Sequence, residues 1–162
     1  MPDSIVIRFI GGTGFVSAGI RYVTNSLWIH TECLSRDGRG WIGAHAGTGV
    51  QERRLDYCKP PYERRYSIPI PEEQFDIAHT WLESKIGEKY DYSDIVGLAL
   101  KHRTWNPHRV ICSALMLQFM QQAGLQPLNV LADFDALCTP ETLHLSPLLI
   151  GKCTYSFQPE RS

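Results

Sequence analysis

Apolar and polar residues follow patterns typical of β-strands in the first half of the chain and again near its end. The predicted strands cover residues 5–10, 28–34, 40–46, 62–70 and 148–157. The second and third of these flank Asp37-Gly38, a dipeptide that favours a tight hairpin turn. We therefore expect an antiparallel sheet that begins early in the chain.

Helical periodicity dominates the later part of the chain. Residues 72–86 form the clearest amphipathic helix, which Gly87 ends. Its expected buried face consists of Phe75, Ala78, Trp81, Leu82 and Ile86. Shorter helices are expected over residues 16–23 and 91–100, and a loop over 102–109. With strands mostly early and helices mostly late, the pattern predicts one α+β domain over residues 1–162.

Cys112 occupies a chemically favourable place, at the junction of an extended run and a helix that ends at Gly124. Its spacing from Met116 puts the thiol on the buried face of the first helical turn. Free backbone N–H groups and the helix dipole favour a thiolate there and can hold an oxyanion. A catalytic cysteine is therefore the leading hypothesis, and an inert buried thiol is the alternative.

Two histidines and a glutamate on the predicted hairpin can serve such a cysteine. Strand alternation places His30 and Glu32 on one face, and His45 on the partner strand can lie beside His30. A catalytic base needs a third group to orient it. Side chains two residues apart on one strand point in parallel, so we expect His45 to be that group and Glu32 to be the second choice.

Composition excludes several classes of function. A formal net charge of −1 gives no electrostatic reason to expect nucleic acid as a partner. Five cysteines without paired short spacing suggest neither a disulfide framework nor a zinc ribbon, so reduced thiols are expected. The sequence shows neither a signal-peptide pattern nor a membrane span, which predicts a cytoplasmic location without stable membrane insertion. An extracytoplasmic substrate would then require lysis or a non-classical export route.

Three further motifs give weaker hypotheses. The glycine turn over residues 10–16 resembles a dinucleotide-binding loop, but Ser17 stands where the third glycine is needed, and no cofactor is expected. Ser113 lies about 100° around the helix from Cys112, which favours packing or capping. His102 and His108 lack a close ligand pair, so no metal site is expected.

Four segments of the chain occur together in a recognisable order. They are His30-Thr-Glu-Cys-Leu34, Ala44-His45-Ala46-Gly-Thr-Gly-Val50, Gly87-Glu-Lys-Tyr90-Asp-Tyr92 and Cys112-Ser113. In this order they resemble the circularly permuted branch of the NlpC-type cell-wall peptidases, often called YiiX-like or YaeF-like, within the papain-like fold. The resemblance runs from about Ile5 to Gly124, and the segment from Thr139 to Leu143 is similar to the C-terminal part of that branch.

The resemblance implies a papain-like, permuted fold, in which an antiparallel sheet or barrel packs against helices that include the nucleophile helix. It implies a thiol peptidase or amidase, with Cys112 as nucleophile, His30 as general base and His45 as orienting residue. The Cys112 backbone N–H and Tyr90 would stabilise the oxyanion, with Tyr92 as the competing tyrosine. No cofactor is implied.

The expected activity is hydrolysis of an amide, in a peptidoglycan-type peptide, through an acyl-enzyme. The first alternative is acyl transfer or thioester hydrolysis on lipid esters, since lecithin-retinol-acyltransferase-like proteins share the order of histidine and cysteine. The second alternative is a catalytically silent binding module of the same fold. The expected partner is thus a peptide or a small acyl substrate.

Overall fold

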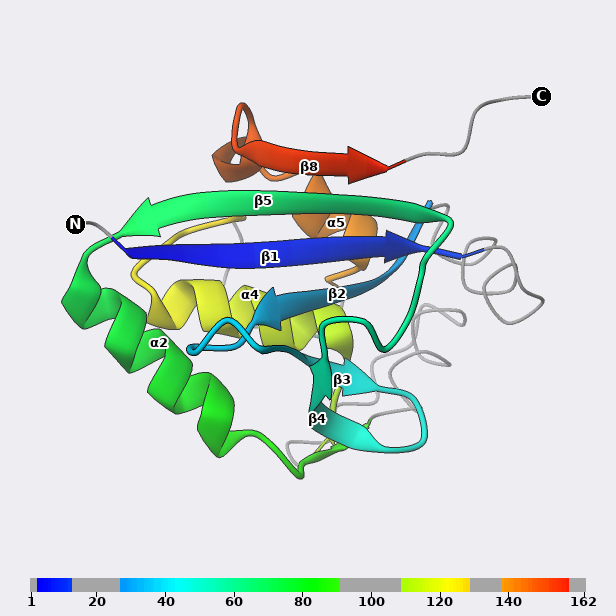
Figure 1. Cartoon of the computed structure of the whole chain (residues 1–162). Coiled ribbons are helices and arrows are strands. Elements are labelled where there is room, and N and C mark those ends of the chain that lie inside the picture. Colours follow the sequence, from blue (N-terminus) through cyan, green and yellow to red (C-terminus); the bar gives the residue numbers. More distant parts are fainter. Residues whose placement is uncertain (1–2, 13–26, 91–108, 129–137, 158–162) are drawn as a thin grey trace.

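The fold is described by a computed structural model that covers residues 3–12, 27–90, 109–128 and 138–157 (Figure 1). The main strands are β1 (Asp3–Gly11), β2 (Trp28–Leu34), β3 (Gly40–His45), β4 (Gly49–Arg54), β5 (Tyr62–Ile70) and β8 (Cys153–Phe157). Two short strands are β6 (Lys89–Tyr90) and β7 (Arg109–Val110). The helices are α2 (Glu72–Ser84), α4 (Cys112–Gln122), α5 (Pro140–His144) and the 3₁₀ turn η2 (Pro147–Leu149).

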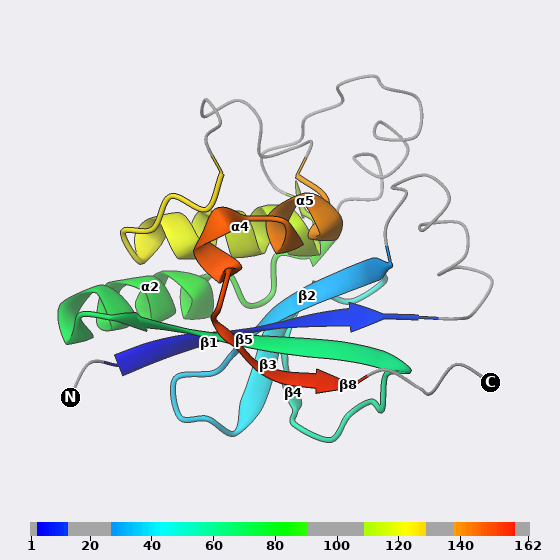
Figure 2. The ribbon, with the colours of Figure 1, turned by 90° about the horizontal axis from the view of Figure 1, so that it is seen from above.

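The six main strands form one sheet in the order β4-β3-β2-β1-β5-β8, and every neighbouring pair is antiparallel. The strands β6 and β7 form a separate parallel pair. Figure 2 shows α2, α4 and α5 on one side of the six-stranded sheet. The predicted α+β fold with an antiparallel sheet is therefore confirmed.

The core lies between the sheet and these helices. Buried apolar residues of β1 (Ile5, Ile7 and Phe9) belong to one cluster with buried residues of α4, which include Leu115, Met116 and Phe119. Burial of large apolar side chains on both sides of this interface supplies the main stabilising free energy. The helix α4 packs directly against β2 and β3 and is thus fixed relative to the predicted hairpin.

The hairpin of β2 and β3 and the helix that begins at Cys112 are confirmed. Gly38 has a φ of 72° in the hairpin turn, and Gly124 has the same φ beyond α4; both are backbone conformations that glycine adopts without strain. The predicted helices over 16–23 and 91–100, and residues 102–108 of the expected loop, lie outside the described residues.

Four details differ from the prediction. Helix α2 ends at Ser84, so Ile86 lies beyond it and is 45% exposed instead of contributing to the buried face. Strand β4 was not predicted because its polar second half, Gln51 to Arg54, lies at an edge of the sheet and lacks an apolar pattern. The last strand starts at Cys153, since the 3₁₀ turn η2 takes up the first part of the predicted segment, and α5 was not predicted.

In the part of the chain that the structure describes, no helix is both long and apolar enough to span a membrane.

Candidate active site

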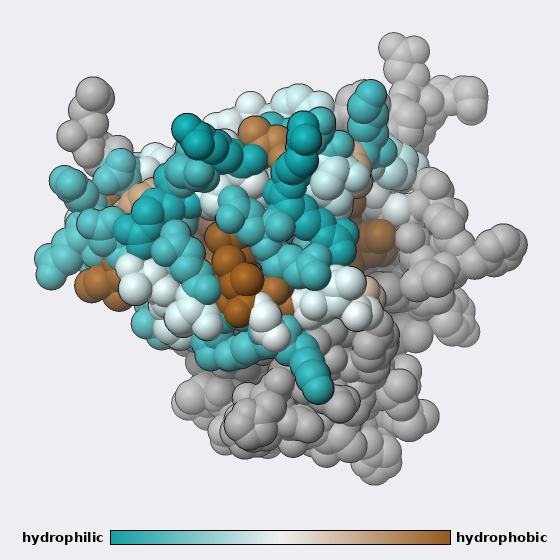
Figure 3. Space-filling view, turned by 60° about the horizontal axis from the view of Figure 1, so that its bottom comes forward, coloured by the Kyte–Doolittle hydropathy of each residue, from teal (hydrophilic) through white to brown (hydrophobic). Residues whose placement is uncertain are grey.

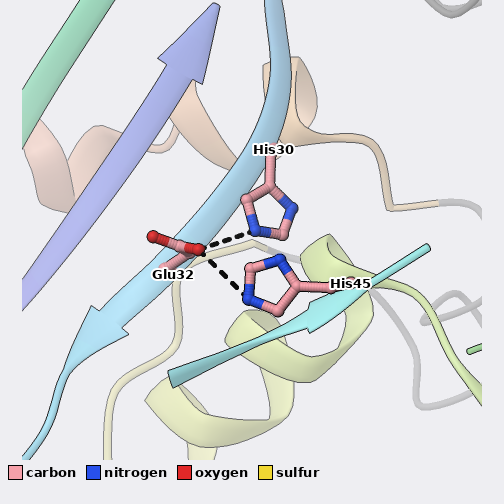
Figure 4. Close-up of side chains that lie close together, drawn as sticks. All are labelled: His30, Glu32 and His45. Carbon is pink, nitrogen blue, oxygen red and sulfur yellow. Dashed lines mark hydrogen bonds and ion pairs between the residues drawn. The ribbon is translucent and has the colours of Figure 1, made fainter. Parts of the chain in front are cut away.

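The neighbouring strands β2 and β3 bring His30, Glu32 and His45 together (Figure 4). The register of β2 and β3 pairs Cys33 with Ile42 and Leu34 with Trp41; continued along the strands, it sets His30 opposite His45. The two imidazole ring centroids are 4.7 Å apart. The cross-strand neighbourhood of the two histidines, predicted from alternation, is therefore observed.

The carboxylate of Glu32, and not His45, holds the imidazole of His30. His30 Nε2 lies 2.9 Å from Glu32 Oε1, and because an ionised carboxylate only accepts, Nε2 carries the donated proton. His45 Nε2 lies 3.4 Å from the same oxygen and has no hydrogen-bond partner among the described residues. Glu32, the second choice for the orienting residue, thus makes the hydrogen bond with His30 that was expected of His45.

A glycine on β3 explains how a neighbour on the same strand reaches the imidazole. A Cβ at Gly43 would lie 2.9 Å from Glu32 Cγ and 3.3 Å from His30 Nε2. Real Cβ atoms are not found this close to other side-chain atoms without displacement. The open space above Gly43 lets the glutamate and the imidazole converge, although their Cα–Cβ bonds point in parallel.

Arg8 and Tyr57 fix the carboxylate of Glu32. Arg8 lies opposite Glu32 in the register of β1 and β2, and its Nε donates to Oε2 at 3.1 Å, while its Nη2 donates to the same oxygen. The Tyr57 hydroxyl donates to Oε1. Arg8 also stacks 4.3 Å over the ring of Trp41 and is 1% exposed. Each carboxylate oxygen therefore has a directional donor, and the rotamer of Glu32 is set from two other parts of the chain.

Cys112 occupies the first position of α4, after Ile111 in an extended conformation, and no side chain caps this helix end. Its side chain is close enough to His30 for the charges of the two groups to interact, and the residue is 4% exposed. Since Nε2 of His30 faces Glu32, Nδ1 is the ring nitrogen that remains for the sulfur. The three groups therefore follow one another in the order sulfur, imidazole, carboxylate.

The charges of the cluster follow from burial and these contacts. Burial itself lowers the pKa of His30, but the charge of Cys112 and the hydrogen bonds to Cys112 and Glu32 outweigh it and raise the pKa to about 10. Burial would raise the pKa of Glu32, but hydrogen bonding and the charges of His30 and Arg8 lower it to about 2. Burial, reinforced by the charge on His30, lowers the pKa of His45 to about 4. At neutral pH the cluster thus contains an imidazolium, a carboxylate and a neutral imidazole.

The other predicted residues are placed as follows. Tyr90 pairs with Val110 across β6 and β7. Its backbone therefore lies beside a residue that precedes Cys112 by two positions in the chain. The side chain of Tyr90, and Tyr92, His102 and His108 altogether, lie outside the described residues. Ser113 is buried and donates a hydrogen bond to the backbone carbonyl of Cys138, as a packing residue would.

Arg8 and Tyr57 are parts of the site that sequence reasoning missed. A signal existed for Arg8, since it interrupts an otherwise apolar strand and an arginine inside a core requires an acidic partner. Tyr57 follows β4 in a polar segment, and its sequence context carries no comparable signal.

The donor atoms of His30, Glu32 and His45 lie within 4.8 Å of one another, which is close enough for a metal ion. Two ligands of a tetrahedral zinc ion, each about 2.1 Å from it, are separated by about 3.4 Å. The separations from Glu32 Oε1 to the two Nε2 atoms, 2.9 and 3.4 Å, approach this value. Two imidazoles and a carboxylate also suit zinc chemically. These residues therefore fit a transition-metal ion.

Fold and site together define an α+β protein with a cluster of two histidines and a glutamate on β2 and β3, the strands against which α4 packs. The crystal structure of the metalloprotein YiiX (DUF1105) from Escherichia coli O157:H7 is similar to this chain, with a TM-score of 0.68 and 16% sequence identity. The alignment covers 99% of each chain. No protein-family model and no curated protein matches the sequence. The chain therefore has a YiiX-like fold.

Proposed function

We propose that this chain is a thiol-dependent hydrolase of amide bonds, with Cys112 as nucleophile, His30 as acid and base, and Glu32 as the orienting residue. The observation that carries the proposal is that His30 is hydrogen-bonded to the Glu32 carboxylate and also interacts electrostatically with Cys112. A nucleophile, a base within reach and a third group that fixes the base form the common arrangement of thiol hydrolases.

In the proposed cycle each group has one task. The Cys112 thiolate attacks the substrate carbonyl carbon, and the electron pair of the carbonyl moves to oxygen, next to the first backbone N–H groups of α4. His30 then transfers its Nδ1 proton to the leaving nitrogen as the carbon–nitrogen bond breaks, which leaves an acyl-enzyme thioester. His30 accepts a proton from water, the hydroxide attacks the thioester, and the acid departs as the thiolate and imidazolium form again.

Glu32 does not itself exchange protons in this scheme. Its carboxylate accepts from His30 Nε2 and so presents Nδ1 to the sulfur. A folded-state pKa of about 2 keeps this carboxylate ionised throughout the cycle. Tyr90 is the proposed second donor to the oxyanion because β6 places its backbone beside the residues that precede Cys112.

The resemblance to permuted NlpC-type peptidases supports a papain-like arrangement in which the base precedes the nucleophile in the chain. It also makes a peptidoglycan-type peptide the first substrate to test. We propose that residues 1–162 act as a single domain, which agrees with the nearly complete alignment to YiiX.

The lipid alternative uses the same groups and differs in its substrate surface. Figure 3 shows the face that comes into view when the bottom of Figure 1 is turned forward. On the described part of this face, hydrophobic side chains lie in small groups between hydrophilic ones. The large exposed apolar residues of the described segments are Leu55, Ile77, Ile86, Leu145, Ile150 and Tyr155. They come from separate elements, and this scatter favours a peptide over a lipid substrate.

The test of the proposed function uses muropeptides and mass spectrometry on the full chain. We expect cleavage of an amide bond by the wild type, loss of cleavage in Cys112→Ser and His30→Ala, and full cleavage in Cys153→Ala, which removes an exposed cysteine in β8. A thiol-specific alkylating probe extends the test to unknown substrates: Cys112 should react faster than Cys153 despite its burial. If Cys112 is no more reactive than Cys153, the chain is a silent binding module instead.

A further inference from the structure

His45 is a buried polar residue that the proposed hydrolytic cycle does not use. It is 7% exposed, and its Nε2 faces Glu32 Oε1 at 3.4 Å without a hydrogen-bond partner among the described residues. A buried ring nitrogen without a partner costs free energy of about 1–3 kcal/mol, so such an arrangement calls for an explanation. A metal ion bound to this nitrogen would explain why it has no hydrogen-bond partner.

The neighbours of His45 complete a set of metal ligands. One ligand atom from each of His30, Glu32 and His45 lies within 4.8 Å of the other two, and Figure 4 shows the two imidazoles on the same side of the carboxylate. All three side chains come from the paired strands β2 and β3, which hold their separations fixed. Such a rigid set of two nitrogens and one oxygen suits Zn²⁺ better than Ca²⁺ or Mg²⁺, which prefer oxygen ligands.

We propose that His30, Glu32 and His45 bind a divalent transition-metal ion and that metal binding and thiol catalysis exclude each other. The exclusion, which rests on the proposed function, follows from shared atoms. His30 Nε2 and Glu32 Oε1 form the hydrogen bond that orients the base, and both would become ligands. An ion at Nε2 replaces the proton there, which passes to solvent. The hydrogen bond by which Glu32 orients His30 toward Cys112 is then lost.

The same atoms predict the effect of each substitution. His45→Asn removes a ligand but leaves the contacts of His30 with Glu32 and Cys112 in place. Cys112→Ser removes the nucleophile but none of the three proposed ligands. His144→Asn is the matched control, because His144 is a partly buried histidine that contacts Tyr66 and Arg64 and is not part of the cluster.

The experiment titrates Zn²⁺ into the chelator-treated full chain and measures heat by calorimetry, with Co²⁺ absorption as the readout of tetrahedral geometry. We expect one ion per chain in the wild type, Cys112→Ser and His144→Asn, and an affinity at least about tenfold lower in His45→Asn. Circular dichroism of each metal-free variant checks its fold. Equal affinity of His45→Asn and the wild type, or no binding by the folded wild type, would overturn the metal site.

The exclusion has its own readout, the rate at which an alkylating probe labels Cys112. Saturating Zn²⁺ should slow labelling in the wild type at least about tenfold, as expected when the orienting contact of the base is lost. The same Zn²⁺ concentration should leave the rate in His45→Asn unchanged. If Zn²⁺ binds and labelling of the wild type does not slow, the two states coexist and the exclusion is refuted. Calorimetry does not depend on thiol reactivity, so failure of the proposed hydrolase leaves the test of metal binding intact.

Discussion

Replacement of Arg8 by methionine tests the central electrostatic arrangement of the site. Arg8 and Glu32 are 1% and 0% exposed, and two guanidinium nitrogens donate to one carboxylate oxygen. Methionine keeps much of the side-chain length and the packing against Trp41, over which the guanidinium lies at 4.3 Å. The substitution therefore removes mainly the charge and the hydrogen bonds, and leaves a buried carboxylate with fewer partners.

The expected loss follows from the burial of this pair. Breaking a buried ion pair by removing one partner costs about 3–5 kcal/mol. Glu32 keeps His30 and Tyr57 as donors, so we expect the low end of this range, about 3 kcal/mol. For a chain of this size, that loss corresponds to a melting temperature lower by roughly 6–12 °C.

Urea unfolding followed by circular dichroism measures this change, and a double-mutant cycle with Glu32→Gln isolates the pair. The Arg8→Met/Glu32→Gln variant should be more stable than the sum of the single changes predicts, because it no longer contains an unpaired buried charge. A loss below about 1 kcal/mol in Arg8→Met, or a coupling energy near zero, would refute the reasoning, since either would mean that the pair is solvated.

Three further predictions concern the same cluster. Glu32→Gln should slow alkylation of Cys112 in chelator-treated protein about 10- to 100-fold, because a neutral amide no longer fixes the imidazolium; an unchanged rate would remove Glu32 from the mechanism. Gly43→Ala should lower the free energy of unfolding by about 1–3 kcal/mol and also slow alkylation of Cys112, because the new Cβ would displace Glu32 and His30. A wild-type free energy of unfolding and a wild-type labelling rate would contradict the close approach of Glu32 and His30 to Gly43. The pKa of Glu32 falls from 4.5 to about 2 on folding, so its contribution to stability is present above pH 4.5 and is lost as the pH falls toward 2. In chelator, the wild type should therefore lose stability more steeply than Glu32→Gln between these pH values, and equal slopes in acid titrations of unfolding would count against the shift.

Local patterns in the sequence were sufficient for most of the architecture. Apolar alternation predicted β1, β2, β3 and β5, and helical periodicity predicted α2 and α4, because burial of one face is a local requirement on sequence. Strand β4 escaped prediction since an edge strand with a polar second half has no such requirement. The helix α5 owes its start to Thr139, whose side chain accepts a hydrogen bond from the Thr142 N–H, a signal that passed unnoticed.

The sequence by itself indicated four residues of the candidate site, His30, Glu32, His45 and Cys112, and missed Arg8 and Tyr57. Alternation set His30 and Glu32 on one face, the hairpin brought His45 beside them, and the helix start placed Cys112, all through short-range geometry. Only the tertiary structure decided which residue contacts His30. That choice depends on Arg8, 24 residues before Glu32, on Tyr57 beyond β4, and on the space above Gly43. The orientation of a buried carboxylate is set by the donors that reach it in space, and strand periodicity does not contain that information.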